Sequence, residues 1–155
     1  MKRHQALEPF SRDHYSGLVV AKHLQDRPGP NSVKELLELW ENELADHFRE
    51  EENLLSPLAT VEMADKLIQD HQEIASMVDK ASTDSLELGE IIDLGKRLHD
   101  HIRWEERELF PALERASDIS SIEVKALEME KRRQEDGYHQ RRAELVNRRK
   151  REKSE

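Results

Sequence analysis

One stretch of the chain, residues 94–109 with the sequence LGKRLHDHIRWEEREL, places two ionisable side chains in the middle of an otherwise apolar helix face. The residues that share this face, at spacings of three or four, are Leu94, Leu98, His101, Glu105 and Leu109. Burying an imidazole and a carboxylate in such a stripe is costly unless something pairs with them. Because a metal ion would pair with both, the stripe predicts a helix that contributes ligands to a cation site.

A second segment repeats this pattern, and two more segments carry half of it. In residues 39–55, LWENELADHFREEENLL, the apolar face contains His47 and, one turn later, Glu51. Single histidines, His14 and His71, interrupt the apolar stripes of two other segments. One buried histidine is commonly a hydrogen-bonded core residue. Four histidines and two glutamates in one core would leave several polar atoms without partners, which favours a metal site over a plain polar core.

Breakers and capping residues predict four amphipathic helices with short connections. The residues that mark the helix ends are Ser11, the DRPGPN segment, the capping box of Ser32 and Glu35, Pro57, and Pro111, which kinks or stops the last helix. The expected helix ranges are 12–25, 32–55, 60–80 and 85–109. Four such helices predict an all-α fold, an up-down-up-down four-helix bundle.

The length of 155 residues suits a domain that buries a real core. We expect a metal-binding bundle over residues 10–116. We expect an additional charged C-terminal helix to form an extension over residues 117–155 that is partly ordered or depends on a partner. From Ser121 onward the chain carries 11 Lys and Arg against 8 Asp and Glu. The residues of this helix that we expect to touch the bundle are Ile122, Leu127 or Ala126, and Met129.

Charge and composition argue against several classes of function. The net charge is −9, with −12 on residues 1–120, whereas nucleic-acid binding needs a basic face. No run approaches about 18 apolar residues, so a membrane span is excluded, and residues 1–10 lack the apolar region of a secretory signal. Without cysteine there is no disulfide, iron–sulfur cluster or thiolate site. The cytoplasm is the expected compartment.

The ligand types indicate which ions the site would take. Four imidazoles and two carboxylates are hard or borderline donors that suit a pair of first-row metals, whereas a single zinc site usually needs fewer ligands. If Glu51 and Glu105 bridge, each ion receives two nitrogens and two carboxylate oxygens, and an oxo or hydroxo bridge adds a fifth donor. Two iron ions held in this way would keep room for O₂, NO or peroxide. Manganese and zinc are alternatives.

At these residues the sequence resembles the hemerythrin-like (HHE cation-binding) family of non-haem di-iron proteins, over roughly residues 10–116. The segments that carry the resemblance are SRDHYSGL around His14, HFREEENLLSPL around His47 and Glu51, DHQEI around His71, and HIRWEERELFPAL around His101 and Glu105. The resemblance implies that the four histidines are terminal metal ligands and that the two glutamates bridge the ions.

The chain departs from respiratory hemerythrins at two positions. They have a second histidine one turn after the third-helix ligand, where this chain has Ala75. Their last bridging carboxylate is an Asp five residues after its histidine. Here Glu105, four residues after His101, is better placed, because Glu106 is rotated off the apolar stripe. With these departures, the set of four histidines and two glutamates resembles that of hemerythrin-like domains of iron homeostasis or of NO and O₂ sensing. Domains that repair iron centres carry a cysteine-bearing segment, and this chain has no cysteine.

Tyr15 and Glu50, the neighbours of His14 and Glu51, are weaker candidates for side chains that support the ligands. His23 and Glu106 are expected to face solvent.

We expect a protein that binds O₂, NO or a related small ligand in sensing, scavenging or iron homeostasis, and we favour a binding protein over an enzyme. Two alternatives stay open. One is a di-iron enzyme that reduces peroxide or NO with an external reductant. The other is an interaction module with a structural metal, whose C-terminal helix engages a protein partner or a second copy.

Overall fold

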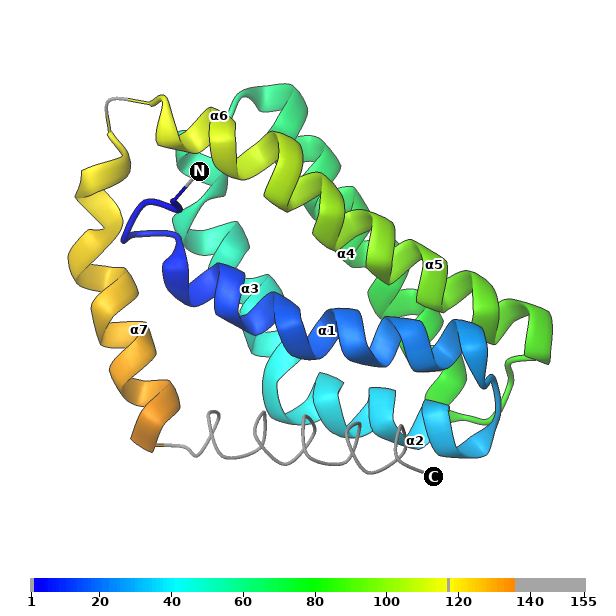
Figure 1. The fold of residues 1–155 in the computed structure, drawn as a ribbon. Coiled ribbons are helices and arrows are strands. Elements are labelled where there is room, and N and C mark those ends of the chain that lie inside the picture. The colour runs from blue at the N-terminus through cyan, green and yellow to red at the C-terminus, as the bar shows by residue number, and fades with distance from the viewer. Residues whose placement is uncertain (1, 117, 136–155) are drawn as a thin grey trace.

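The structure, a computed structural model, describes residues 2–116 and 118–135, and within these ranges all regular secondary structure is helical (Figure 1). The prediction of an all-α bundle is confirmed. The α-helices are α1 (Glu8–Asp26), α2 (Pro30–Leu39), α3 (Ala45–Leu54), α4 (Val61–Ser82), α5 (Leu88–Trp104), α6 (Phe110–Glu114) and α7 (Glu123–Glu135). Among these described helices, none has both the length and the apolar character that crossing a membrane requires.

Two π-helical turns join α-helices end to end. The turn η1 (Trp40–Leu44) connects α2 to α3, and η3 (Glu105–Leu109) connects α5 to α6. In each case the first N–H after the turn donates to the carbonyl at its start, five residues back. Such π turns are frequent at functional sites. The bundle therefore consists of four long helical rods, which are α1, α2–α3, α4 and α5–α6.

The rods begin and end at residues that differ in part from the predicted ones. The first begins at Glu8 instead of Arg12, because Pro9 suits a first helical turn and Phe10 is fully buried. Ser11 is therefore not its cap, and the Ser11 hydroxyl donates to Glu106 instead (2.8 Å). The third rod begins as predicted, with the Thr60 side chain accepting from the N–H of Met63.

Three other predicted boundaries differ from the observed ones. The helix α2 begins at Pro30, and the Ser32 hydroxyl bonds back to Gly29, so Ser32 lies inside the helix and does not form a capping box with Glu35. The fourth rod begins at Leu88, three residues later than expected. It also continues past Pro111 to Glu114, because Pro111 lies in the first turn of α6, where a missing N–H is tolerated.

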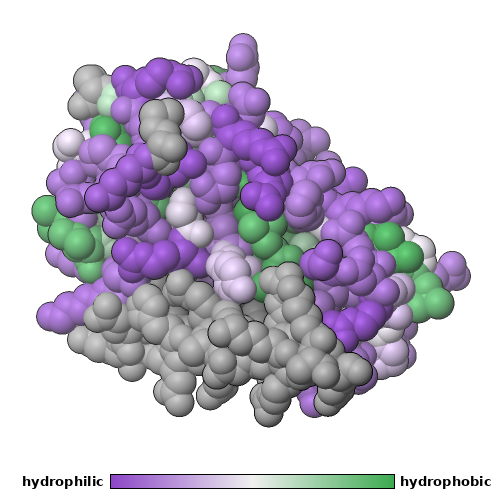
Figure 2. Space-filling view, in the orientation of Figure 1, coloured by the Kyte–Doolittle hydropathy of each residue, from purple (hydrophilic) through white to green (hydrophobic). Residues whose placement is uncertain are grey.

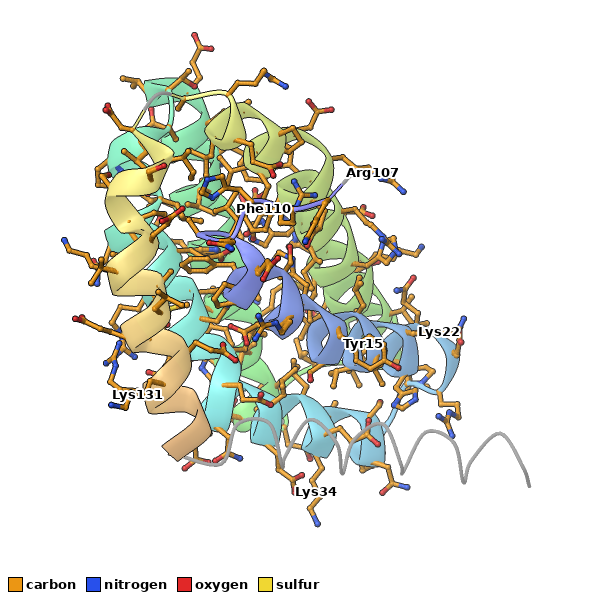
Figure 3. The ribbon with its side chains drawn as sticks, turned by 60° about the vertical axis from the view of Figure 1, so that its left-hand side comes forward. Tyr15, Lys22, Lys34, Arg107, Phe110 and Lys131 are labelled. Atoms are coloured by element: carbon orange, nitrogen blue, oxygen red, sulfur yellow. The ribbon has the colours of Figure 1, made fainter. Side chains whose placement is uncertain are left out.

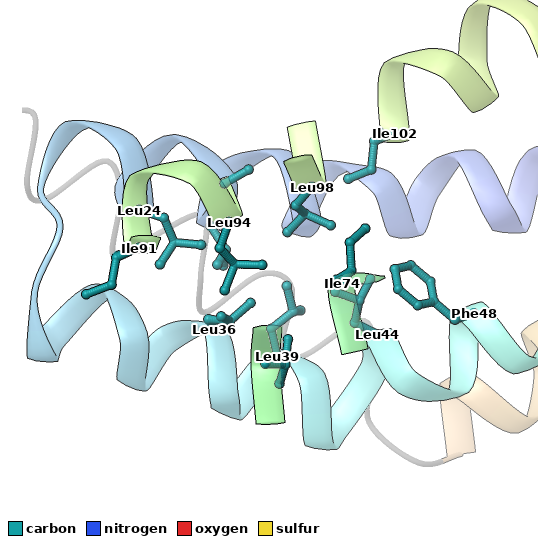
Figure 4. Close-up of a cluster of buried hydrophobic side chains, with 13 residues drawn as sticks. Leu24, Leu36, Leu39, Leu44, Phe48, Ile74, Ile91, Leu94, Leu98 and Ile102 are labelled. Atoms are coloured by element: carbon teal, nitrogen blue, oxygen red, sulfur yellow. The ribbon is translucent and has the colours of Figure 1, made fainter. Parts of the chain in front are cut away.

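Two apolar clusters lie on either side of a layer of ionisable side chains. The first cluster, between α1, α2–α3, α4 and α5, includes Leu44, Phe48, Ile74, Leu98 and Ile102 (Figure 4). The second includes Phe10, Leu55, Leu67, Leu109 and Phe110. Along each rod, the predicted site residues fall between members of the two clusters. In α4, for example, His71 lies between Leu67 and Ile74.

The helix α7 packs beside α1, across one side of the bundle (Figure 1). The short turn η4 (Ile119–Ile122) precedes it, and the buried apolar residues of this region are Ile119, Ile122, Ala126 and Met129. The sequence leaves Ala126 and Leu127 as alternatives for the contact with the bundle, and it is Ala126 that is buried, whereas Leu127 is exposed. The remainder of the predicted extension, residues 136–155, lies outside the described residues.

The surface of the bundle is mostly hydrophilic, and the hydrophobic side chains on the face shown in Figure 2 form separate patches. Exposed large apolar residues occur on four different helices of the described part of the chain: Tyr15, Val61, Leu88, Val124 and Leu127. These exposed residues are dispersed over the surface.

A close helix contact at Gly95 sets the distance between α1 and α5. A Cβ atom added at Gly95 would lie 2.7 Å from the carbonyl oxygen of Ala21 and 2.9 Å from the Cβ of Leu24. Because one of these atoms belongs to the backbone, the helices themselves would have to separate. Gly89, near the start of the same helix, has nothing within 4 Å of such a Cβ.

We predict that Gly95→Ala lowers the free energy of unfolding by about 1–3 kcal/mol, the usual cost of overpacking a close contact. Chemical denaturation measures this change. The control is Gly89→Ala, which should be neutral or slightly stabilising because alanine favours a helix over glycine. Equal effects of the two substitutions would show that the close contact does not constrain the packing of α1 against α5.

Candidate metal centre

The six predicted site residues converge in the layer between the two apolar clusters. The first rod supplies His14 from α1, and the second supplies His47 and Glu51 from α3. The third supplies His71 from α4, and the fourth supplies His101 from α5 and Glu105 from η3. All six residues are at most 4% exposed.

The imidazoles point their Nε2 atoms at the two central carboxylates. The Glu51 carboxylate lies 3.2 Å from Nε2 of both His47 and His71, and 3.7 Å from Nε2 of His14. The Glu105 carboxylate lies 2.5 Å from Nε2 of His101 and 3.4 Å from Nε2 of His14. Both glutamates therefore face imidazoles from more than one helical rod.

The same six side chains form two overlapping groups that could each hold one ion. The first group is His14, His47, Glu51 and Glu105, and the second is Glu51, His71, His101 and Glu105. In each group, one ligand atom from every member lies within 4.8 Å of the others. Each group contains two histidines, and both glutamates are shared. The arrangement thus places the glutamates where they could bridge two ions.

The inward-facing atoms of this cluster lack hydrogen-bond partners. The Nε2 atom of each of the four histidines and both carboxylate oxygens of Glu51 and Glu105 are buried without any hydrogen bond. Leaving a buried polar atom unpaired costs about 1–3 kcal/mol, so eight such atoms in one place would be a large penalty. A pair of cations at the centre would satisfy all of them, and the residues therefore fit a metal pair.

A second set of carboxylates holds the outward-facing Nδ1 atoms. Glu106 lies 2.8 Å from Nδ1 of His14. Asp13 lies 2.9 Å from Nδ1 of His47. Histidine ligands to metals commonly donate their other ring N–H to a carboxylate, which sets both the tautomer and the ring orientation.

The second pair of histidines is supported less evenly. Asp70 lies 3.0 Å from Nδ1 of His101. Glu52 is 3.7 Å from Nδ1 of His71, and that nitrogen has no hydrogen bond. Sequence reasoning missed these carboxylates, although a signal was present. The signal is that each of these carboxylates is adjacent in sequence to a predicted site residue. The histidine that it faces lies on a different rod, and this depends on how the rods pack.

Phenylalanine rings wall the imidazoles on two sides. The ring of Phe48 stacks on His71 with centroids 3.8 Å apart, and the ring of Phe110 stacks on His14 at 5.4 Å. Phe110 points into the bundle in Figure 3, whereas Tyr15 lies on its outside. These rings exclude water from the centre, which strengthens every electrostatic interaction there.

The carboxylates change the protonation of the imidazoles. Burial lowers the pKa of His14, but its hydrogen bond with Glu106 and the charge of Glu51 outweigh this and raise the pKa to about 9. The pKa of His47 is likewise raised, because Glu51 and Asp13 outweigh burial. Burial dominates for His101, and its pKa is lowered although Asp70 opposes the shift. Burial would raise the pKa of Glu51, but the neighbouring imidazoles lower it well below its ordinary value.

Several other predicted positions lie outside the cluster. Tyr15 is 43% exposed on the outer side of α1, and Glu50 forms an ion pair with Arg132 of α7 (3.1 Å). His23 was expected to face solvent, but it is buried against Glu35 (2.7 Å), because α2 packs over that side of α1.

Glu106 was also expected to face solvent, and this prediction is wrong. It follows Glu105 within the π turn η3, where the wider turn rotates successive side chains by less than an α-helix does. The carboxylate of Glu106 consequently reaches His14 on the neighbouring helix.

The raised pKa of His14 predicts that the stability of the metal-free protein depends on pH, and that bound metal removes this dependence. A histidine whose pKa is about 9 when folded and 6.5 when unfolded contributes stability below pH 6.5, and this is lost as the pH rises toward 9. We therefore expect the metal-free protein to lose about 1 kcal/mol of unfolding free energy per pH unit across this window. With Zn²⁺ bound, the imidazoles are already deprotonated and the loss should vanish. Urea unfolding at several pH values measures both slopes. Equal slopes would contradict the prediction.

Comparison with known proteins identifies a family for this chain. The family model described as the hemerythrin HHE cation-binding domain matches residues 2–113, a range that contains all six residues of the cluster. Searches among curated proteins and among solved structures gave no match.

Proposed function

Because the chain belongs to the hemerythrin HHE cation-binding domain family, we propose that its buried cluster holds two metal ions side by side. The four histidines would serve as terminal ligands, two for each ion, and Glu51 and Glu105 would bridge the pair. The observation that carries this proposal is the set of eight buried nitrogen and oxygen atoms that face one another without a hydrogen bond.

We propose iron as the metal, with manganese and zinc as alternatives. Imidazole nitrogens and carboxylate oxygens suit all three, and the chain offers no thiolate because it has no cysteine. Two irons in this site would supply open coordination positions and redox activity for a small ligand such as O₂, NO or peroxide. The outer carboxylates would keep the imidazoles in the correct tautomer, and Phe48 and Phe110 would keep bulk water away.

The proposed role is the binding of such a small ligand in sensing, scavenging or iron homeostasis. Respiratory hemerythrins have an additional histidine where this chain has Ala75, whose methyl group cannot bind a metal. Each ion would therefore have only two nitrogen ligands from the protein. This leaves more of the coordination sphere open than a reversible oxygen carrier would need.

We assign the metal-binding unit to residues 10–116 and the extension to residues 117–155. All six proposed ligands lie in the first range, and α7 contributes no atom to either group of ligands. What α7 does contribute is apolar packing against one side of the bundle, through the buried residues Ala126 and Met129.

We predict two metal ions per chain after reconstitution with Fe²⁺ or Zn²⁺, counted by elemental analysis. Glu105→Gln should lower the stoichiometry to one ion or fewer, because a neutral amide is a poor bridging ligand. The matched control is Glu108→Gln, which changes an exposed glutamate in the same π turn and should leave two ions bound. Unchanged stoichiometry in Glu105→Gln would rule out a bridging role for that residue.

Reactions with small ligands would separate a binding protein from an enzyme. For the iron-loaded protein we expect NO or azide to produce a saturable change in the visible absorption spectrum. We also expect peroxide with an external reductant to be consumed only in stoichiometric amounts. Sustained peroxide consumption that is lost in Glu105→Gln but kept in Glu108→Gln would replace the binding role with an enzymatic one.

A further inference from the structure

The two proposed metal positions have the same ligand types but differ in the side chains behind those ligands. We propose that the position held by His71 and His101 is the exchangeable one, which gains and loses its ion through a groove between α4 and α5. The position held by His14 and His47 releases its ion more slowly. This inference rests on the proposed function, because it concerns how the two ions are held and released.

Behind His14 and His47, both outer carboxylates are close and well fixed. The distances from the Nδ1 atoms to Glu106 and Asp13 are 2.8 Å and 2.9 Å. The Asp13 side chain is only 5% exposed. Glu106 also accepts hydrogen bonds from Ser11 (2.8 Å) and from Arg3 (3.0 Å). Both imidazoles are therefore held rigidly from behind.

Behind His71 and His101, the support is weaker. Nδ1 of His71 is buried without a hydrogen bond, and the nearest carboxylate, Glu52, is 3.7 Å away. His101 has Asp70 at 3.0 Å, but Asp70 also binds Lys66 (3.0 Å), whose side chain is 47% exposed. One imidazole of this pair therefore lacks its outer partner, whereas both imidazoles of the first pair have one. The partner of the other is shared with a lysine that is more exposed (47%) than Arg3 (24%), the cation that shares Glu106.

The position held by His71 and His101 is also the one that lies nearer to a surface groove. A groove of about 530 Å³ runs between α4 and α5, and its lining includes Lys66, Asp70, Arg97 and His101. The ligand His101 thus contributes to the wall of the groove although its side chain is only 1% exposed, and the Asp70 carboxylate beside it is 18% exposed. An ion pair between Arg97 and Glu73 joins the two helices along the groove.

The opposite side of the cluster is covered. The helix α7 is tied to α1 by the ion pair of Arg12 with Glu130 (2.7 Å) and to α3 by that of Arg132 with Glu50 (3.1 Å). Arg12 and Glu50 are the sequence neighbours of Asp13 and Glu51. The segment before α1 adds Arg3, which binds Glu106 and Glu114. An ion leaving the His14 and His47 position would have to pass this cover.

Outer carboxylates typically change metal affinity by about 10- to 100-fold, which is enough to separate the release of two otherwise similar ions. For the test, the metal-free full-length protein is loaded with two equivalents of Co²⁺ and then challenged with excess EDTA. The visible absorption of the bound cobalt follows its release. We expect two phases of similar amplitude.

Two matched substitutions assign the phases. Asp70→Asn should speed the fast phase about 10- to 100-fold and leave the slow phase unchanged, whereas Asp13→Asn should speed only the slow phase. If Asp70→Asn does not fold, as judged by circular dichroism, Lys66→Gln tests the same position. It removes the exposed cation that shares Asp70 with His101, so it should slow the fast phase and leave the slow phase unchanged.

The outcomes separate this inference from the proposed function. Two ions that leave in a single phase, or a fast phase that responds to Asp13→Asn and not to Asp70→Asn, would overturn the inference while leaving the two-metal site intact. A protein that takes up no stoichiometric cobalt would overturn the proposed function itself, and this inference with it.

Discussion

The burial of six ionisable side chains in a single layer is the constraint on which the rest of the structure depends. Four imidazoles and two carboxylates, each at most 4% exposed, lie between two apolar clusters. Such groups are costly to bury unless each finds a partner. Their partners are one another, the outer carboxylates and, we propose, two metal ions. The four rods must therefore pack so that their polar residues meet at one height in the bundle.

The outer carboxylates connect the orientation of each ligand to the packing of the helices. Asp13 is next to His14 in α1, yet its carboxylate supports His47 in α3. Asp70 is next to His71 in α4, yet it supports His101 in α5. Consecutive residues of one helix, which project in different directions, thus present a ligand to the centre and a carboxylate to a ligand of a neighbouring helix. A shift between rods would disturb a ligand and its support together.

Much of the fold and of the site could be predicted from helical periodicity. Spacings of three and four residues indicated the four rods and brought His47 and Glu51 onto one face, because that face recurs every turn. The errors lie where local sequence does not control the outcome. The fourth rod continued beyond its predicted end at residue 109, because Pro111 lies in the first turn of α6. Glu106 turned inward, since a π turn changes the register at Glu105–Leu109. Burial of His23 depends on α2, which no local pattern around His23 reveals.

The sequence by itself determined the helical class, the six polar residues of the layer and the family resemblance that the family match bears out. These follow from residue types and from the fixed geometry of the α-helix. Only the tertiary structure decided which carboxylate stands behind which histidine, and that α7 covers one side of the cluster while a groove opens on the other. Those features depend on contacts between residues that are distant in the chain, and their positions are set by how the rods pack together.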